Sequence, residues 1–130
     1  MTAVVKSLTT PRFARDSMVD IMVHRNTIRA YARRIAKEFK PEKIILFGSY
    51  AYGTPTEDSD VDIMVIMRHK GCSVDQAVAI RRRVEASFPM DLLVRTPAKI
   101  KKRLAMRDWF MREVFEKGRV IYESGSRRLD

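Results

Sequence analysis

The segment from Gly48 to Asp62, which reads GSYAYGTPTEDSDVD, constrains the fold of this chain more than any other. It joins two apolar runs, Ile44–Phe47 and Val61–Met67, and short runs of this kind are typical of buried strands. Gly48 allows the backbone to turn sharply as it leaves the first run. The chain therefore leaves one buried strand, turns and enters another, which predicts a sheet with a polar loop at one end.

Two carboxylates, Asp60 and Asp62, stand two residues apart where the second strand begins. Because side chains alternate along a strand, both are expected on one face, while Val61 and Ile63 face the core. Carboxylates this close repel each other unless a cation lies between them or one is protonated. Oxygen ligands without His or Cys nearby favour Mg²⁺ or Mn²⁺ over Zn²⁺. The alternative is a polar strand edge that faces solvent.

A third carboxylate, Asp91, stands inside the apolar run Met90–Val94, where a buried charge is energetically costly unless it is paired or binds a metal. If this run pairs beside Val61–Met67, Asp91 completes a cluster of three acids. Three acids suit a two-metal site, in which the ions clamp the attacking and leaving oxygens of an in-line displacement at phosphorus. The alternative is that Asp91 is only a polar strand-start residue after Pro89.

Gly48 and Ser49 are candidate phosphate ligands. Gly48 has no Cβ and lets an anion approach the main chain, and Ser49 stands where a helix or turn begins, with free N–H groups and a hydroxyl. The simpler interpretation is that Ser49 is an ordinary N-cap. Gly-Ser, ten residues and Asp-x-Asp together are expected by chance in roughly one or two chains per thousand of this length.

The rest of the chain alternates helices and strands. This predicts an α/β or α+β fold in which helices pack on a small mixed sheet of about four strands. Helical spacing of apolar residues predicts a leading helix over 18–39, ended by Pro41. Ser73 is the expected N-cap of a helix over 73–87, which Pro89 ends. The remaining expected elements are a strand over 90–94, a helical region over 97–117 with Gly118 as C-cap, and an edge strand over 119–122.

A length of 130 residues allows one domain, expected over 16–123 between a loosely held arm (1–15) and a polar tail (124–130). No uncharged run is long enough to span a bilayer, and the N-terminus has no apolar core for a signal peptide. The single cysteine, Cys72, cannot form an internal disulfide. We therefore expect a cytoplasmic protein without a membrane partner.

The chain is strongly basic, with 26 Lys and Arg against 16 Asp and Glu and a formal net charge of +10. Such a field attracts polyanions without choosing among nucleic acid, nucleotides and an acidic protein. Arg81–Arg83 spread over three faces of the expected helix, which favours a solvated surface. The basic residues that follow the third strand could neutralise pyrophosphate or grip an acidic partner; they are Arg95, Lys99, Lys101, Lys102 and Arg103.

Several other residues are interpreted as structural. His24, His69 and Cys72 are isolated, without spacing suited to metal binding or a catalytic triad. Core positions are expected for the eight methionines and for the aromatic residues Trp109, Phe110 and Phe115. Any exposed remainder of the region 98–117 is a candidate protein-docking face.

These spacings lead to a family. Gly48-Ser49, ten residues and Asp60-x-Asp62, with a further acid on a later strand, resemble the DNA polymerase β-like nucleotidyltransferase superfamily. The stretches LFGSYAYG and SDVDIMV are most similar to its minimal nucleotidyltransferase (MNT) branch. The resemblance covers about residues 43–94.

The resemblance implies a nucleotide site and a two-ion site. By that resemblance Gly48 and Ser49 hold the nucleotide triphosphate, and Asp60, Asp62 and Asp91 bind two Mg²⁺ ions, or Mn²⁺, and are the catalytic residues. Asp91 is also able to assist deprotonation of the acceptor hydroxyl. Many relatives have a basic residue in place of Tyr52, so this chain departs from the family pattern there.

MNT proteins often act as antitoxins beside a HEPN-domain ribonuclease, to whose tyrosine they transfer AMP from ATP. The resemblance therefore implies an adenylyltransferase (AMPylation) with ATP as substrate and a HEPN toxin as partner. Two alternatives stay open: transfer to a small molecule or a nucleic-acid end, and a non-catalytic antitoxin or adaptor that covers its partner. Relatives that act on small molecules or nucleic acid generally carry extra helical domains, so length favours an acceptor on another protein or completion of the site in a homodimer. Nucleic acid is not an expected partner, although the basic charge is compatible with one.

Overall fold

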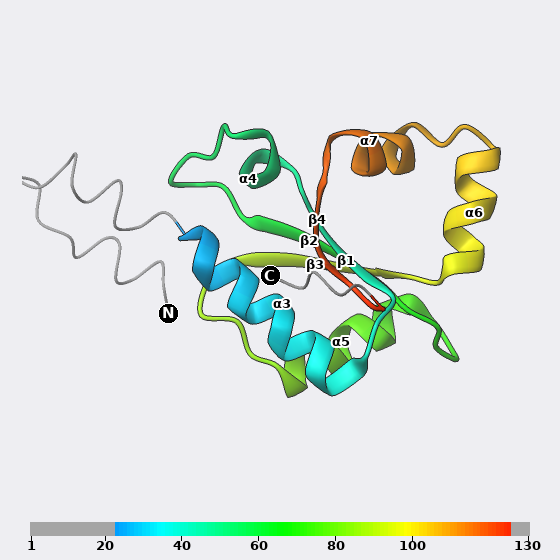
Figure 1. Ribbon diagram of the computed structural model, residues 1–130, viewed down its shortest axis with the longest axis horizontal. Coiled ribbons are helices and arrows are strands. Elements are labelled where there is room, and N and C mark those ends of the chain that lie inside the picture. Colours follow the sequence, from blue (N-terminus) through cyan, green and yellow to red (C-terminus); the bar gives the residue numbers. More distant parts are fainter. Residues whose placement is uncertain (1–22, 126–130) are drawn as a thin grey trace, which may run out of the picture.

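Residues 23–125 are described by a computed structural model, in which a four-stranded sheet has the strand order β3-β2-β1-β4 (Figure 1). β1 pairs antiparallel with β2 and with β4, while β2 and β3 are parallel. The expected mixed α/β fold is confirmed. The elements in chain order are α3 (Arg25–Phe39), β1 (Lys43–Phe47), α4 (Ser49–Tyr52), β2 (Val61–Ile66), α5 (Ser73–Arg83), β3 (Met90–Arg95), α6 (Pro97–Ala105), α7 (Trp109–Lys117) and β4 (Arg119–Glu123).

Helices cover both faces of the sheet, with α3 and α5 below it and α6 and α7 on the other side in Figure 1. Alternation along the strands divides the core accordingly. Ile63 and Val65 of β2 pack in the cluster that includes residues of α3 and α5, and Met64 and Ile66 pack in the cluster of α6 and α7. All four side chains are at most 5% exposed. Each face of β2 is therefore committed to its own layer of helices.

The leading helix begins later than expected within the described residues. α3 starts at Arg25, and His24 is its N-cap, with the ring Nδ1 accepting from the backbone N–H of Asn26 at 3.1 Å. This gives His24 a structural role, as expected. At the other end Lys40 takes a left-handed conformation, φ 50°, before Pro41. Residues 18–22 lie outside the described residues.

Helix α5 differs from its expected form at both ends. Cys72, not Ser73, is the N-cap, and the Ser73 hydroxyl lies 3.2 Å from Nε2 of His69 instead. The helix ends at Arg83 rather than near Ser87, so Pro89 does not terminate it. The physical reason is that Val84 is buried in an extended conformation.

The helical region expected over 97–117 is two helices. Arg107 has φ 60°, a left-handed conformation that interrupts the helix, and Asp108 then caps α7 by accepting from the N–H of Met111 at 2.9 Å. Once the helix is interrupted, the N–H groups that follow have no carbonyl acceptor in the preceding turn. The side chain of an N-cap residue accepts from these N–H groups, so a second helix can begin there. Gly118 is the C-cap of α7, as expected.

The break between α6 and α7 exposes side chains that were expected in the core. Trp109 is 72% exposed and Met106 62% exposed, so both expectations are wrong. Phe110 and Phe115 are half-buried and pack against the core on the α6/α7 face. Four methionines are buried as expected: Met64, Met67, Met90 and Met111. Met1, Met18 and Met22 lie outside the described residues.

The expected arm (1–15) and most of the expected tail (126–130) also lie outside the described residues, and Ser124 and Gly125 form a turn. Over residues 23–125, no helix combines the length and the apolar character that crossing a membrane would require.

Candidate active site

Asp62 and Asp91 lie directly opposite each other on neighbouring strands. In the parallel pairing of β2 with β3, Asp62 is in register with Asp91. Their side chains leave on the same face as Met64 and Leu93, which belong to the core on the α6/α7 side. The third strand therefore pairs beside the second, which is the condition on which the three-acid prediction depended.

The pKa of Asp62 is raised, as is expected for a half-buried carboxylate close to other carboxylates. Its pKa is raised from 3.8 to about 6, first by burial, then by the charges of Asp91 and Asp60, and then by a hydrogen bond with Asp91. Asp62 is half-buried, whereas Asp60 and Asp91 are exposed. The three acids thus act on one another through Asp62, while the two outer ones remain accessible to solvent.

Gly48 lies against the Asp62 carboxylate. A Cβ at position 48 would collide with Oδ2 of Asp62 and would lie 3.0 Å from its Cγ. The backbone of Gly48 also has φ 75° and ψ −161°, a conformation that residues other than glycine rarely adopt. Only glycine satisfies both conditions, and the result is direct contact between the turn and the acid at the start of β2.

Ser49 is the first residue of α4, and Gly48 is its N-cap, so the interpretation of Ser49 as an ordinary N-cap is wrong. The N–H groups of Ala51 and Tyr52 donate to the carbonyl oxygen of Gly48 at 2.9 and 3.0 Å. The first N–H groups of a helix have no intrahelical acceptor. With the N–H groups of Ala51 and Tyr52 used within the turn, the candidate donors beside the contact between Gly48 and Asp62 are the N–H group and the hydroxyl of Ser49.

Tyr52 links α4 to α7 through Glu113, a residue that sequence reasoning missed. The Tyr52 hydroxyl donates to Oε2 of Glu113 at 3.2 Å. The pKa of Tyr52 is raised by burial first and then by the charge of Glu113, with a smaller contribution from Asp62. Tyr52 is thus close enough to Asp62 for the charge of Asp62 to affect its pKa, and it carries no positive charge, unlike the basic residue that the family resemblance led us to expect. No local sequence signal distinguishes Glu113 from the other acids of α7.

Comparison with known families identifies the domain. Residues 28–122 match the model of the nucleotidyltransferase domain. The chain belongs to this family. The match covers the strands that carry Asp62 and Asp91 and the Gly48-Ser49 step, and it agrees with the MNT resemblance.

Similar proteins include two from Methanocaldococcus jannaschii. One, named "Putative protein adenylyltransferase MJ0604", is 33% identical over 84 residues, which cover 62% of this nucleotidyltransferase and 78% of the relative. Another, "Putative protein adenylyltransferase MJ1379", is 47% identical over 38 residues, covering 29% of this chain and 38% of the relative. Among solved structures, the crystal structure of a "putative nucleotidyltransferase" from Sulfolobus solfataricus has a TM-score of 0.55 at 20% identity, covering 76% of this chain and 79% of that one, and it shows the shared fold.

The acids of this nucleotidyltransferase provide the oxygen ligands that a hard divalent cation prefers, without His or Cys. Asp62 and Asp91 supply two carboxylates in register, and Asp60 is near enough to raise the pKa of Asp62. Within residues 23–125, no three His, Cys, Asp or Glu side chains are gathered as a complete metal-binding group. The donor chemistry fits a divalent ion, and the two-ion site stays a prediction.

The other basic candidates have contacts away from the acids. Arg81 donates to the carbonyl oxygen of Met90 at 3.1 Å, and Arg83 pairs with Glu38 at 3.1 Å. Arg95 lies at the opposite end of β3 from Asp91. Arg103 pairs with Asp108 at 3.5 Å, and the three lysines of α6 are exposed, namely Lys99, Lys101 and Lys102. None of these contacts assigns them a role in phosphate binding.

Proposed function

We propose that this chain is a Mg²⁺-dependent adenylyltransferase that moves AMP from ATP to a tyrosine hydroxyl of a partner protein. The observation that carries the proposal is the register of Asp62 with Asp91 beside the Gly48 turn. Membership of the nucleotidyltransferase family supports the reaction class. The names of the Methanocaldococcus jannaschii relatives support a protein as acceptor.

In the reaction, the acceptor oxygen attacks the α-phosphorus of ATP, the bond to the pyrophosphate oxygen breaks, and the acceptor loses its proton. Asp91 is an exposed carboxylate that an incoming hydroxyl can reach, so it is the group that we propose to accept this proton. The N–H groups and hydroxyl at Gly48 and Ser49 would donate to phosphate oxygens. Because Gly48 has no Cβ, the Asp62 carboxylate lies directly against the turn, which brings a candidate metal ligand beside these donors.

Asp60, Asp62 and Asp91 are the residues that would hold Mg²⁺. When bound there, the ions would neutralise charge on the phosphoryl oxygens and lower the pKa of the acceptor hydroxyl. With a pKa of about 6, Asp62 is mainly ionised at neutral pH and is therefore available as a ligand.

We further propose that the acceptor is a HEPN-domain toxin encoded by the neighbouring gene, and that this chain is its antitoxin. The support is the MNT resemblance together with the protein acceptor named for the relatives.

The test is incubation of the purified chain with ATP labelled at the α-phosphate, Mg²⁺ and the product of the neighbouring gene. We expect label on a tyrosine of that product, identified by mass spectrometry, and loss of labelling in EDTA. Tight binding of the partner without label would contradict the enzymatic proposal and favour an antitoxin that acts by covering its partner. Label on a small molecule or a nucleic-acid end would contradict the protein acceptor alone.

Asp62→Asn and Asp60→Asn should each lower the labelling rate by about 10³-fold, because loss of charge neutralisation costs several kcal/mol in the transition state. Asp58→Asn is the matched control, since Asp58 is an exposed acid of the same loop. It should stay within about twofold of the unsubstituted rate. Equal loss in the control and in Asp62→Asn would show that the overall negative charge of this segment, rather than Asp60 and Asp62 themselves, matters.

A further inference from the structure

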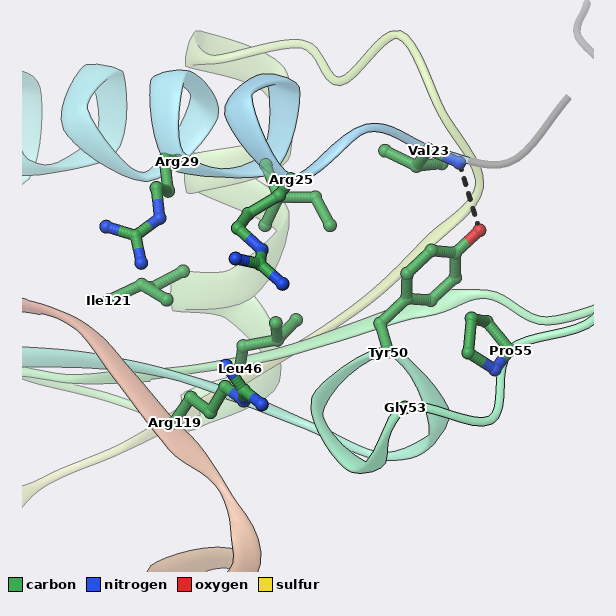
Figure 2. A pocket seen from close by; sticks show the side chains of 10 residues that line it. Val23, Arg25, Arg29, Leu46, Tyr50, Gly53, Pro55, Arg119 and Ile121 are labelled. Carbon is green, nitrogen blue, oxygen red and sulfur yellow. Dashed lines mark hydrogen bonds between the residues drawn. The ribbon is translucent and has the colours of Figure 1, made fainter. Parts of the chain in front are cut away.

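A basic pocket lies on the sheet face opposite the acids, between α3, α4 and β4 (Figure 2). Its volume is about 280 Å³. Arg119 is in register with Leu46, whose side chain belongs to the core on the α3/α5 side. Asp62 and Asp91 leave on the other face, so the sheet separates this pocket from the candidate active site.

Three arginines line the basic pocket and approach it from two elements. Arg25 and Arg29 are four residues apart on α3 and therefore share one helix face. Figure 2 shows their guanidinium groups directed into the space between α3 and β4, with Arg119 on the far side. Arg119 donates from Nε to the carbonyl oxygen of Ala51 at 3.2 Å. Within residues 23–125, none of the three arginines forms an ion pair with a carboxylate.

The remaining wall of the basic pocket is mainly apolar. Ile28, Leu46 and Ile121 contribute aliphatic surface, and Tyr50 contributes its ring. The Tyr50 hydroxyl accepts from the N–H of Val23 at 3.1 Å, the bond drawn in Figure 2, which ties α4 to the start of α3. The pocket thus combines three arginines, which pair with no carboxylate of residues 23–125, with an apolar and aromatic side.

We propose that the basic pocket binds a phosphate monoester with a compact aromatic organic group, no larger than a mononucleotide. The planar fork of arginine matches phosphate oxygens through paired hydrogen bonds, and three guanidinium groups can surround a doubly charged phosphate. The apolar side and the Tyr50 ring suit the organic group. The volume of about 280 Å³ is slightly below the range for drug-sized ligands, roughly 300–1,000 Å³, which limits the occupant to a small molecule.

The test uses the full chain with Asp62→Asn, in EDTA, so that binding at the candidate active site is weakened. Calorimetric titration with AMP, inorganic phosphate and adenosine separates the contributions of the phosphate and of the organic group. We expect AMP to bind more tightly than inorganic phosphate and adenosine not to bind. Amide NMR signals of Tyr50 and Ile121 should shift with AMP, and those of Asp60 and Asp91 should not.

The joint substitution Arg25→Gln, Arg29→Gln and Arg119→Gln should weaken AMP binding by at least about tenfold. Arg33→Gln is the matched control, because Arg33 is an exposed arginine of α3 that does not line the pocket. Should the joint variant unfold, Arg29→Gln alone, read by the NMR shifts, provides the same test.

The proposal is overturned if AMP binding survives the joint substitution, if adenosine binds as tightly as AMP, or if neither phosphate compound binds. Equal binding of AMP and inorganic phosphate would overturn the monoester assignment and leave a site for free phosphate. None of these outcomes depends on nucleotidyl transfer, so the basic pocket and the proposed function can fail separately.

Discussion

Two charged clusters lie on opposite faces of one sheet. The acids at the start of β2 and β3 form a negative cluster, and the arginines of the basic pocket form a positive one. The acids are short side chains, and the strand register holds Asp62 opposite Asp91. The arginines are long side chains that start from a helix and from an edge strand, as Arg29 and Arg119 do. Helix α4 lies next to both clusters, with Gly48 against Asp62 and Tyr50 in the pocket wall.

The difference between the clusters is how far each can relax. Two carboxylates on paired strands cannot separate far without disturbing the sheet, and burial first and then the charges of Asp91 and Asp60 raise the pKa of Asp62. Guanidinium groups on flexible stems can move apart or extend into water. We therefore expect the acidic end to respond sharply to small changes in the backbone and the basic pocket to tolerate them.

The largest expected effect on stability is that of Gly48→Ala. It places a Cβ against Oδ2 of Asp62 and imposes strain at φ 75°. We expect a loss of about 3 kcal/mol in the free energy of unfolding, measured by urea denaturation, because strain and steric overlap add. Nucleotidyl transfer should fall with it, since the contact between the turn and Asp62 is lost.

Gly53→Ala is the control, because Gly53 has φ 85° but nothing within 4 Å of its added Cβ. It should lose only the strain, about 1–2 kcal/mol. Equal losses at the two glycines would mean that the close approach of Asp62 to Gly48 has no energetic consequence, and the contrast between rigid and tolerant clusters would be broken.

The pH dependence of stability comes next in size. The pKa of Asp62 is about 6 in the folded protein and 3.8 in the unfolded chain, so between these values the folded state binds more protons. The contribution of Asp62 to stability is therefore lost as pH rises from about 4 to 6 and stays lost above that window.

Asp62→Asn should remove this penalty. We expect a gain of about 1 kcal/mol at pH 8 in EDTA, and little change at pH 3.5, after allowing for solvent screening of a half-exposed group. Thermal or urea unfolding at both pH values measures it. A variant that is equally stable relative to the parent at both pH values would contradict the repulsion inferred at the acidic end.

The smallest expected effects distinguish the two sides of α4. Tyr50→Phe removes the acceptor of the half-buried N–H of Val23 and should cost about 1 kcal/mol. Tyr52→Phe removes an exposed hydrogen bond to Glu113 and should cost about 0.5 kcal/mol or less. Urea denaturation measures both. A larger loss for Tyr52→Phe would place the tighter contact on the acidic side.

Much of the fold followed from local sequence patterns. The apolar runs at Ile44–Phe47 and Val61–Met67 coincide with β1 and β2 within a residue. The turn at Gly48 and the position of Asp62 on β2 followed from local properties, namely the conformational freedom of glycine and the period of a strand, whereas Asp60 lies just before β2 rather than on it. Their roles in nucleotide and metal binding remain predictions.

Other features depended on contacts between distant residues. The end of α5 is set by Val84, which is buried and whose carbonyl oxygen accepts from the Tyr31 hydroxyl at 2.7 Å. The exposure of Trp109 follows from the break at Arg107, which the apolar spacing of 97–117 did not reveal. No local sequence pattern predicts the end of α5 or the break between α6 and α7, because each depends on a balance between helix propagation and tertiary packing.

By itself the sequence determined which residues are candidates for chemistry: a Gly-Ser turn, two acids with strand spacing and a third on a later strand. Only the tertiary structure decided that β3 pairs in parallel with β2, which brings Asp91 to Asp62, and that Arg25, Arg29 and Arg119 meet on the other face. The physical reason is that spacing along a chain specifies the direction of each side chain, whereas strand pairing and helix packing specify its neighbours.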